Sequence, residues 1–579
     1  MFQQRCRIAE LLRRATILAA VLSTPMPCVA AEDEVSEIKA VHRSGQTFVT
    51  WKDVAAGEAG AKYRYSLYRG TEPITTGNWE RAELCYRGVL NNSAKLYGAA
   101  FTQKDRLDPG KPYVQLDPDG SPLPPWSGLA VHTARRTGAA YYAVLATDEM
   151  YNVVGKIIPG RNATIDAVTE RPSPIQPLKL YDSRERTGPY VASTCITGKR
   201  GLPLHLTLHG SQSNGGGAGE YGDYYLFFGT PEMGFRDGLA GVFSVQELHA
   251  KEGNRLLLRV RDAVEHPSGK RAMETYWFGY YCTPQGADHS EPRVYPFTAE
   301  QLLWITDWVV EHYGVDRERV TVGGSSSGGV GSWNFGLRHP ERFAAVYPII
   351  GRVRRVPAIP LEGKLERDNA ALMADGKTTY YDYLDGPKFV TEHAADLSFV
   401  GWSCGRNDGY ATWQENIDMV KAMTAEHHGF AFSWNNGGHG EGGRAMTLIN
   451  KYYPVEKFAH NLSYPAFGNS SIDQKMGNGD PLDGDLVGGI NLGFSWDQVV
   501  DEPDRWSVSL TNDLAQQEMT VDVTPRRCRQ FKVPPGKQVH WQSSLGETGK
   551  ATADAAGLIT IRQVKLRPRA AALLTLQFQ

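Results

Sequence analysis

Cysteine is scarce in this chain, with only 7 among 579 residues, and no two of them lie in a C-x-x-C spacing. A zinc ribbon or a disulfide-dense scaffold is therefore excluded. A strong charge is also missing, because 62 Lys and Arg against 64 Asp and Glu give a formal net charge of −2. This balance gives no electrostatic reason to expect nucleic acid as a partner. Beyond the first thirty residues no apolar run is long enough to cross a bilayer, and no clear internal repeat is visible.

The start of the chain has the pattern of a targeting segment. Four arginines precede the apolar run 15–22, and the small residues Val29, Ala30 and Ala31 precede an acidic stretch. This order is typical of a secretory signal, so we expect residues 1–31 to be removed and the protein to be secreted or periplasmic, without a membrane anchor. Export permits disulfides, but sequence alone does not pair the five remaining cysteines, which are Cys85, Cys195, Cys282, Cys404 and Cys528.

The clearest chemical signal is the stretch from Val320 to Val330, VTVGGSSSGGV. A β-branched run ends in glycines and serines, and an amphipathic stretch follows, which predicts a strand, a sharp turn and a helix. Within it, residues 324–328 fit the G-x-S-x-G nucleophile elbow, where larger residues at the glycine positions would clash. Ser326 fits best, because Ser325 and Ser327 each have a serine where the motif has glycine.

The pattern along the chain predicts three folded parts. Strand and helix signals alternate over residues 178–460, which predicts an α/β domain with a mostly parallel sheet. Two helices are expected there, 298–313 and 412–427, each opened by a capping box, Thr298 with Gln301 and Thr412 with Glu415. All-β patterns predict β-sandwiches at 34–170 and 462–579, and the proline-rich stretch 170–177 connects the first of these to the α/β domain.

Two further residues stand where a nucleophilic serine needs partners. Asp408 follows the predicted strand 396–404, and His439 follows the last strand of the α/β part, between Gly438 and Gly440. A serine nucleophile needs a base, and the base needs an acid that orients it. The order Ser326, Asp408, His439 therefore predicts a catalytic triad. Asp382 and Asp418 are weaker candidates for the acid, because neither follows a clean strand end.

These motifs resemble known families. Residues of about 180–460 look like an α/β-hydrolase of the secreted esterase and prolyl-oligopeptidase-like group, on the evidence of GGSSSGG around Ser326, GRND at Asp408, GGHG at His439 and the pair His209-Gly210. The resemblance implies an oxyanion hole formed by the N–H of Ser327 and the N–H of Ser211 or a neighbour. It implies acyl transfer without a metal or organic cofactor. Ser211-Gln212 departs from the H-G-G-G form of lipases.

The N-terminal part resembles a second family. Trp51, the strand Tyr63–Gly70 and the later Tyr142-x-Val144-x-Ala146 pattern are similar to a fibronectin type III domain. In this chain the middle of that domain, at about residues 78–129, is longer than the usual loops of the family and is expected to be an insertion.

Substrate preference is less directly encoded. Trp277 and Tyr280 precede the elbow helix, and Trp402, Tyr410, Trp413 and Trp434 flank the acid and the base, so together they predict a flat apolar mouth for aromatic or polymer-linked esters. Trp277 and Tyr280 are the expected substrate-binding residues. Asp480, Asp483 and Asp485 are flanked by glycine but fit no calcium loop, so we expect a solvated loop there.

Three functions compete on this evidence. The leading hypothesis is a secreted serine carboxylesterase, and the second is an amidase or peptidase with the same three residues. The third is a carbohydrate-binding or adhesion protein with an inert hydrolase core. Against a typical prolyl oligopeptidase, the N-terminal part lacks propeller repeats. The oligomeric state is left open.

Overall fold

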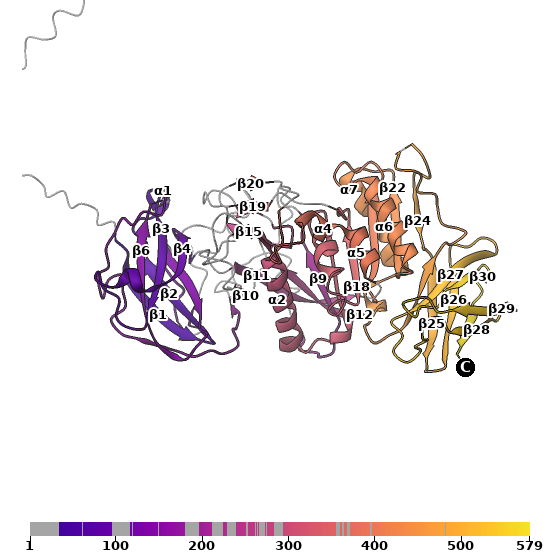
Figure 1. The fold of residues 1–579 in the computed structure, drawn as a ribbon, viewed down its shortest axis with the longest axis horizontal. Coiled ribbons are helices and arrows are strands. Elements are labelled where there is room, and N and C mark those ends of the chain that lie inside the picture. The colour runs from indigo at the N-terminus through magenta and orange to yellow at the C-terminus, as the bar shows by residue number, and fades with distance from the viewer. Residues whose placement is uncertain are drawn as a thin grey trace, which may run out of the picture.

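The computed structural model describes most of the chain after residue 33. The described residues are 34–60, 62–94, 116–117, 120–124, 126–148, 150–179, 196–210, 224–228, 239–250, 253–260, 262, 264–265, 272–273, 275–282, 293–354, 359–361, 364–366, 371–393, 396–480 and 482–578. Figure 1 shows three parts in a row, an N-terminal all-β part, a central part with helices, and a C-terminal all-β part. Residues 1–31, the expected signal, lie outside the described residues.

The N-terminal part is built from antiparallel strands in two sheets, in the orders β1-β2-β5 and β4-β3-β6-β7. Both sheets contribute to one buried cluster, with Val49 and Trp51 from one sheet and Tyr65 and Tyr142 from the other. The fibronectin type III assignment stays a prediction. The strands and the short helix of this part are β1 Ser36–Arg43, β2 Gln46–Lys52, α1 Gly57–Gly60, β3 Arg64–Gly70, β4 Glu83–Leu90, β5 Ser127–Thr133, β6 Gly138–Thr147 and β7 Val168–Glu170.

A ten-stranded sheet organises the central part, in the order β24-β22-β21-β18-β17-β9-β12-β11-β10-β8. The six strands from β22 to β12 pair in parallel, and the outer pairs are antiparallel. The expected mostly parallel sheet is therefore confirmed. The strands are β8 Leu178–Lys179, β9 Leu204–Leu208, β10 Tyr224–Phe228, β11 Leu239–Ala250, β12 Gly253–Val260, β17 Val320–Ser325, β18 Ala345–Ile349, β21 Phe399–Gly405, β22 Phe430–Asn435 and β24 Gly488–Ile490.

Helices connect the parallel strands and cover the sheet. They are α2 Phe297–Tyr313, α3 Ser327–Gly331 continued by a π-helical turn at Ser332–Gly336, α4 Tyr380–Leu384, α5 Gly386–Glu392, α6 Trp413–Ala425, α7 His439–Gly442 and α8 Met446–Tyr452. Among the described residues of the central part, three short two-stranded pairs lie outside the sheet, namely β13 Val264–Glu265 with β14 Ala272–Met273, β15 Tyr280–Cys282 with β16 Arg293–Tyr295, and β19 Ile359–Leu361 with β20 Lys364–Glu366. Among the described residues, no helix is both long and apolar enough to span a bilayer.

The observed helix ends agree only in part with the caps that the sequence predicts. Gly314 ends α2 in the left-handed conformation, φ 61°, as its position after the apolar periodicity predicts. The capping box expected at Thr298 is wrong, because α2 begins one residue earlier and the buried Thr298 hydroxyl is hydrogen-bonded to the hydroxyl of Thr275. Thr412 does stand at the N-cap of α6, but its side chain makes no capping bond. Tertiary contacts here override a local signal.

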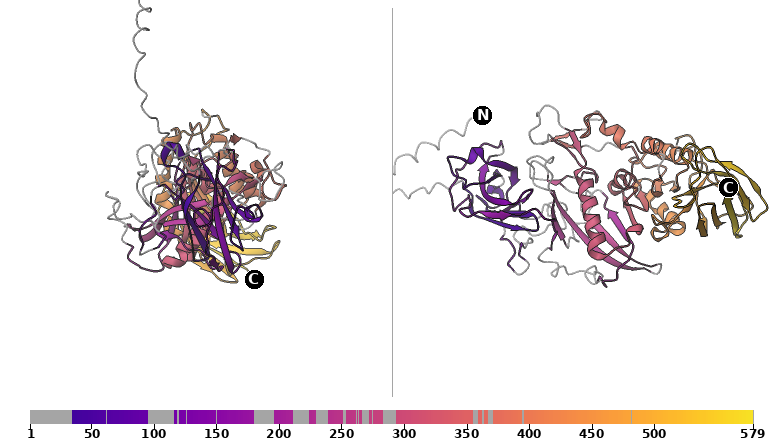
Figure 2. Two further views of the ribbon diagram at one scale, coloured as in Figure 1. Left: turned by 90° about the vertical axis from the view of Figure 1, so that its left-hand side faces the viewer. Right: turned by 60° about the horizontal axis from the view of Figure 1, so that its bottom comes forward.

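Alternation along the central strands gives the sheet two apolar faces with different neighbours. On one face, Val400 and Phe432 pack with Ile417 and Met423 of α6. On the other face, Tyr347 and Phe399 pack with α8 and with the C-terminal part. The C-terminal part therefore covers the second face of the sheet at β18, β21 and β22. In the right-hand view of Figure 2 the C-terminal part adjoins the central part.

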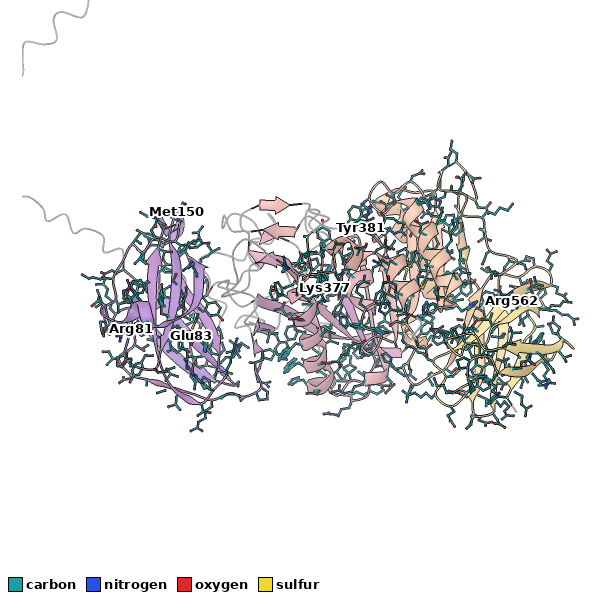
Figure 3. All side chains as sticks on the ribbon, in the orientation of Figure 1. Arg81, Glu83, Met150, Lys377, Tyr381 and Arg562 are labelled. Carbon is teal, nitrogen blue, oxygen red and sulfur yellow. The ribbon has the colours of Figure 1, made fainter. Side chains whose placement is uncertain are left out.

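The C-terminal part is antiparallel, with sheets in the orders β23-β27-β30 and β25-β26-β31-β28-β29. Its strands are β23 Tyr464–Gly468, β25 Phe494–Asp501, β26 Arg505–Asn512, β27 Met519–Arg526, β28 Gln538–Ser543, β29 Thr548–Thr552, β30 Ile561–Leu566 and β31 Ala572–Gln577. The boundary expected at residue 462 does not separate the central and C-terminal parts completely. After β23 the chain returns to the central sheet as β24, which pairs with β22, before it continues into β25. In Figure 3, Arg562 marks the C-terminal part, at the opposite end of the molecule from Arg81 and Glu83.

Candidate active site

Ser326 occupies a strained turn between β17 and α3. Its backbone has φ 56° and ψ −113°, a conformation that a residue with a side chain rarely adopts. The surrounding structure holds it there, because the Ser326 N–H donates to the carbonyl of Ile349 at 2.9 Å and Val330 N–H donates to the Ser326 carbonyl at 2.9 Å. A strained serine between a strand and a helix is the geometry of a nucleophile elbow.

The two glycines of the elbow are required by a close approach of β9. A Cβ on Gly324 would lie 2.4 Å from the Leu208 carbonyl oxygen, and a Cβ on Gly328 would lie 2.0 Å from the same atom. No side chain fits at either distance. The glycines thus let the turn pack against the end of β9, which brings His209 and Gly210 next to Ser326.

Asp408 and His439 come to Ser326 from the ends of the next strands. Asp408 follows β21, and His439 begins α7 shortly after β22. Ser326 Oγ lies 2.7 Å from His439 Nε2, and His439 Nδ1 lies 2.8 Å from Asp408 Oδ2. The structure therefore brings together the three residues that the sequence places in one triad.

The turn that carries Asp408 (the acid turn) and the turn that leads to His439 (the base turn) are hydrogen-bonded to each other. Asn407 N–H donates to the Gly437 carbonyl at 3.1 Å, and the Asn407 side chain donates to the Asn436 carbonyl at 2.9 Å. A Cβ on Gly405 would lie 2.3 Å from the Gly437 carbonyl oxygen, so the two turns are in close contact. These contacts therefore help to set the distance between Asp408 and His439.

Asp408 is buried, and its two oxygens have different partners. Oδ1 accepts hydrogen bonds from the N–H groups of Tyr410 and Ala411, at 2.8 and 3.0 Å, and Oδ2 faces His439. The ring of Tyr410 meets the ring of His439 edge to face, with 5.0 Å between centroids. The two weaker acid candidates are engaged elsewhere, because Asp382 binds Lys388 and accepts from Thr379, and Asp418 binds Arg354.

The expected oxyanion donors are placed only in part. Ser327 is the first residue of α3, so its N–H has no acceptor within the helix and is available beside Ser326. A Cβ on Gly210 would lie 3.7 Å from Ser326 Cβ, which puts the chain before Ser211 next to the nucleophile. Ser211 itself lies outside the described residues.

A buried network that the sequence did not reveal holds His209 in place. Asp262, at the end of β12, accepts hydrogen bonds from the N–H of Thr275 and of Trp277, both at 2.9 Å to Oδ2. Its own N–H donates to His209 Nε2 at 3.0 Å, and His209 Nδ1 lies 2.8 Å from the Gly210 carbonyl oxygen. His209 is therefore neutral, with the proton on Nδ1. The position of Asp262 after a parallel strand is the signal that could have found it.

The aromatic residues expected at the mouth are mostly core residues. Trp277 is completely buried, packs against the His209 ring with 4.5 Å between centroids, and donates from Nε1 to the His209 carbonyl at 3.3 Å. The expectation that Trp277 binds substrate is therefore wrong, because its ring supports the loop behind the nucleophile. Trp402, Trp413 and Trp434 are also buried, in the core beside α6. Tyr280 lies in β15, outside the part of the chain whose side chains are described.

Neither a metal nor a disulfide is assigned at this site. Among the described residues, no group of three or more His, Cys, Asp or Glu could hold a metal ion. Cys85, Cys404 and Cys528 are free thiols. Burial raises the pKa of the Cys528 thiol to about 12 and that of Cys404 well above its usual range. Cys195 and the side chain of Cys282 lie outside the described residues.

Comparison with known proteins gives only distant likenesses. No protein-family model matches the chain, and no curated protein matches it either. Among solved structures, a ferulic acid esterase is 18% identical, covers 45% of this chain and 86% of its own, and has a TM-score of 0.27. The S-formylglutathione hydrolase FrmB of Staphylococcus aureus is 14% identical, with coverages of 42% and 78% and a TM-score of 0.26. A carboxylesterase of Bacillus cereus is 14% identical, with coverages of 44% and 92% and a TM-score of 0.24. At these TM-scores none of the likenesses decides the function.

Proposed function

We propose that the protein is a serine hydrolase of the α/β-hydrolase type that cleaves carboxylic esters through an acyl-enzyme. The observation that carries this proposal is the hydrogen-bonded chain from Ser326 Oγ to His439 and on to Asp408, at 2.7 and 2.8 Å. A nucleophile, a base and an orienting acid at these distances are the arrangement that acyl transfer requires. The strained backbone of Ser326 supports the assignment of that serine as the nucleophile.

In the first half of the reaction, His439 Nε2 takes the proton of Ser326 Oγ as the oxygen attacks the ester carbonyl. Asp408 Oδ2 accepts from Nδ1–H, so it holds the ring in the tautomer whose Nε2 is free to accept. The N–H of Ser327, and in our proposal that of Ser211 or a neighbour, stabilises the oxyanion. The imidazolium then gives its proton to the departing alcohol, which leaves an acyl group on Ser326.

In the second half, water replaces the alcohol. His439 takes a proton from water, the hydroxide adds to the acyl carbonyl, and Ser326 recovers its proton as the acid product leaves. This scheme needs no metal and no organic cofactor. The pattern of residues 1–31 supports our further proposal that the protein is exported and meets ester substrates outside the cytoplasm.

Hydrolysis of a series of p-nitrophenyl esters, from acetate to octanoate with one aromatic acyl ester, tests the proposal. We expect the wild type to turn over at least one of them and Ser326→Ala to lose about 10⁴-fold or more in kcat, because the remaining groups cannot form the acyl-enzyme. Ser325→Ala is the matched control, since it removes the neighbouring hydroxyl of the same elbow. We expect it to keep wild-type kcat.

The other possible outcomes would indicate a different nucleophile or a different function. Equal ester hydrolysis by the wild type and Ser326→Ala would exclude Ser326 as the nucleophile. Turnover of arylamides but not of esters would favour an amidase or peptidase that uses the same residues. Absence of both activities, together with polysaccharide capture by the folded protein, would favour a binding protein with an inert core.

A further inference from the structure

Arg406 stands two residues before Asp408, and its side chain is almost completely buried. Its guanidinium group donates to three backbone carbonyls, to Asp485 at 2.6 Å, to Asp480 at 3.1 Å, and to Asp483. The same group lies 5.1 Å from the ring centroid of Trp413, within the range of a cation–π interaction. A planar group with five N–H donors suits a set of converging carbonyls.

The three carbonyls belong to a segment that we call the arm, residues 475–487, which runs between β23 and β24. β24 is antiparallel to β22, with Gly488 opposite Trp434. The residues just before Gly488 therefore lie at the end of the sheet where the acid and base turns leave it. Trp434 Nε1 donates to the Asp485 carbonyl at 2.9 Å, which fixes the arm from the side of the base strand.

The fold of the arm explains its glycines and its acids without a metal. Gly477, Gly479 and Gly484 have φ of 79°, 106° and 89°, a backbone conformation that favours glycine. The Asp485 side chain accepts from Lys475 N–H at 2.7 Å, and the Asp483 side chain accepts from Asn478 N–H at 2.9 Å. The acids therefore shape the arm, and Arg406 fills the site that its carbonyls form.

We propose that Arg406 is a positioning residue that fixes the Asp408 turn against the arm, an inference that rests on the proposed function. The buried guanidinium depends on these three carbonyls, because without them it would lose the hydrogen bonds that offset its desolvation. The contact joins the acid turn to a segment that leaves and re-enters the C-terminal part. Loosening it displaces Asp408 relative to His439, and a displacement of about 1 Å costs about 10²-fold in rate.

The test compares kcat and KM of Arg406→Met, Arg406→Lys and the wild type on one p-nitrophenyl ester. Concentrations are corrected by titrating Ser326 with a fluorophosphonate, so that only folded, competent enzyme is counted. We expect kcat of Arg406→Met to fall about 10- to 100-fold with KM within about twofold of wild type. Arg406→Lys should be intermediate, because lysine keeps the charge but has three donors on a single nitrogen.

Gly484→Ala tests the arm from its own side, and it serves if Arg406→Met fails to fold. A Cβ at Gly484 would lie 2.6 Å from the Gly477 nitrogen and from the Lys475 oxygen, and φ of 89° strains any alanine there. It leaves Arg406 and the triad unchanged in sequence. We expect the same loss of kcat without a matching rise in KM.

Arg527→Met is the matched control. Arg527 is also buried and also donates to carbonyls of the central part, to Ala344 at 3.1 Å and Phe343 at 3.3 Å, but these precede β18 at the opposite end of the sheet. We expect it to lower the melting temperature and leave kcat unchanged. The proposal fails if Arg406→Met keeps kcat within twofold, if only KM changes, or if Arg527→Met loses kcat equally. None of these results contradicts the proposed function. The proposed function fails on a different result, namely ester hydrolysis by Ser326→Ala at the wild-type rate.

Discussion

At the scale of single residues, the two oxygens of Asp408 decide how the acid can work. Oδ1 is held by two backbone N–H groups, and Oδ2 is left to face His439. An asparagine at this position would keep its oxygen on the two N–H donors and turn its amide nitrogen toward His439 Nδ1. The ring would then carry its proton on Nε2, where it cannot accept the proton of Ser326.

We therefore expect Asp408→Asn to fold normally and to lose about 10³- to 10⁴-fold in kcat, because the wrong tautomer of His439 is imposed. The measurement is kcat on the best p-nitrophenyl ester, with circular dichroism as the control for folding. A loss below tenfold would show that another group orients the base.

The same scale shows what sequence could and could not predict at the site. Ser326, Asp408 and His439 were predictable because each follows a strand end and has glycines or turn residues around it. Trp277 was not, because an aromatic residue near a motif has the same pattern whether its ring faces substrate or supports a loop. The partners of Arg406 were not predictable either, since they are carbonyls of a segment 74 to 79 residues away.

At the scale of elements, one buried carboxyl in the N-terminal part ties stability to pH. Asp53 follows β2, is nearly inaccessible to solvent, and accepts a hydrogen bond from the N–H of Asn92. Burial raises its pKa to about 7, against about 3.9 in an unfolded chain. Between those values the folded protein holds a proton that the unfolded chain has released, so stability falls as pH rises toward 7 and then levels off.

Asp53→Asn removes this dependence, because the amide keeps an oxygen for Asn92 and carries no charge. We expect the variant to match the wild type near pH 4 and to exceed its local stability by about 2–4 kcal/mol at pH 8. Hydrogen exchange of peptides from residues 34–94 in the full chain, at both pH values, measures the difference. An equal gain at both values would mean that packing, not ionisation, causes it.

Local sequence signals predicted the positions of some elements but failed at the N-terminus of α2. Periodicity placed α2, α6 and β21 to within a few residues, since burial against the sheet imposes it. The cap of α2 was mispredicted because the Thr298 hydroxyl is hydrogen-bonded to Thr275, which itself bonds Asp262. A side chain engaged in a buried hydrogen bond is not free to cap a helix, and sequence does not show which of the two bonds forms.

At the scale of the whole molecule, the two terminal parts relate to the central sheet differently. Among the residues that the structure describes, the apolar clusters of the N-terminal part draw only on that part. The largest cluster of the C-terminal part continues into the central sheet, through Tyr347, Phe399 and Ala431, and includes Tyr453 and Phe458. A boundary at 462 was predictable from the change in pattern, but a core that crosses it was not, because one strand pattern does not show what covers its second face.

Removal of residues 462–579 should therefore unfold the central part. It takes away β24 and the arm and exposes large side chains that each contribute about 1.5–3 kcal/mol by burial. Several of these together equal the whole stability of a typical domain, about 5–15 kcal/mol.

Removal of residues 1–170 is the matched control, because it leaves the clusters around the central sheet whole. We expect the first truncation to bind a hydrophobic dye, to lack a cooperative thermal transition and to be inactive. The second should melt cooperatively and hydrolyse the same esters as the full chain. A cooperative transition in the first truncation would show that the sheet does not depend on the C-terminal part.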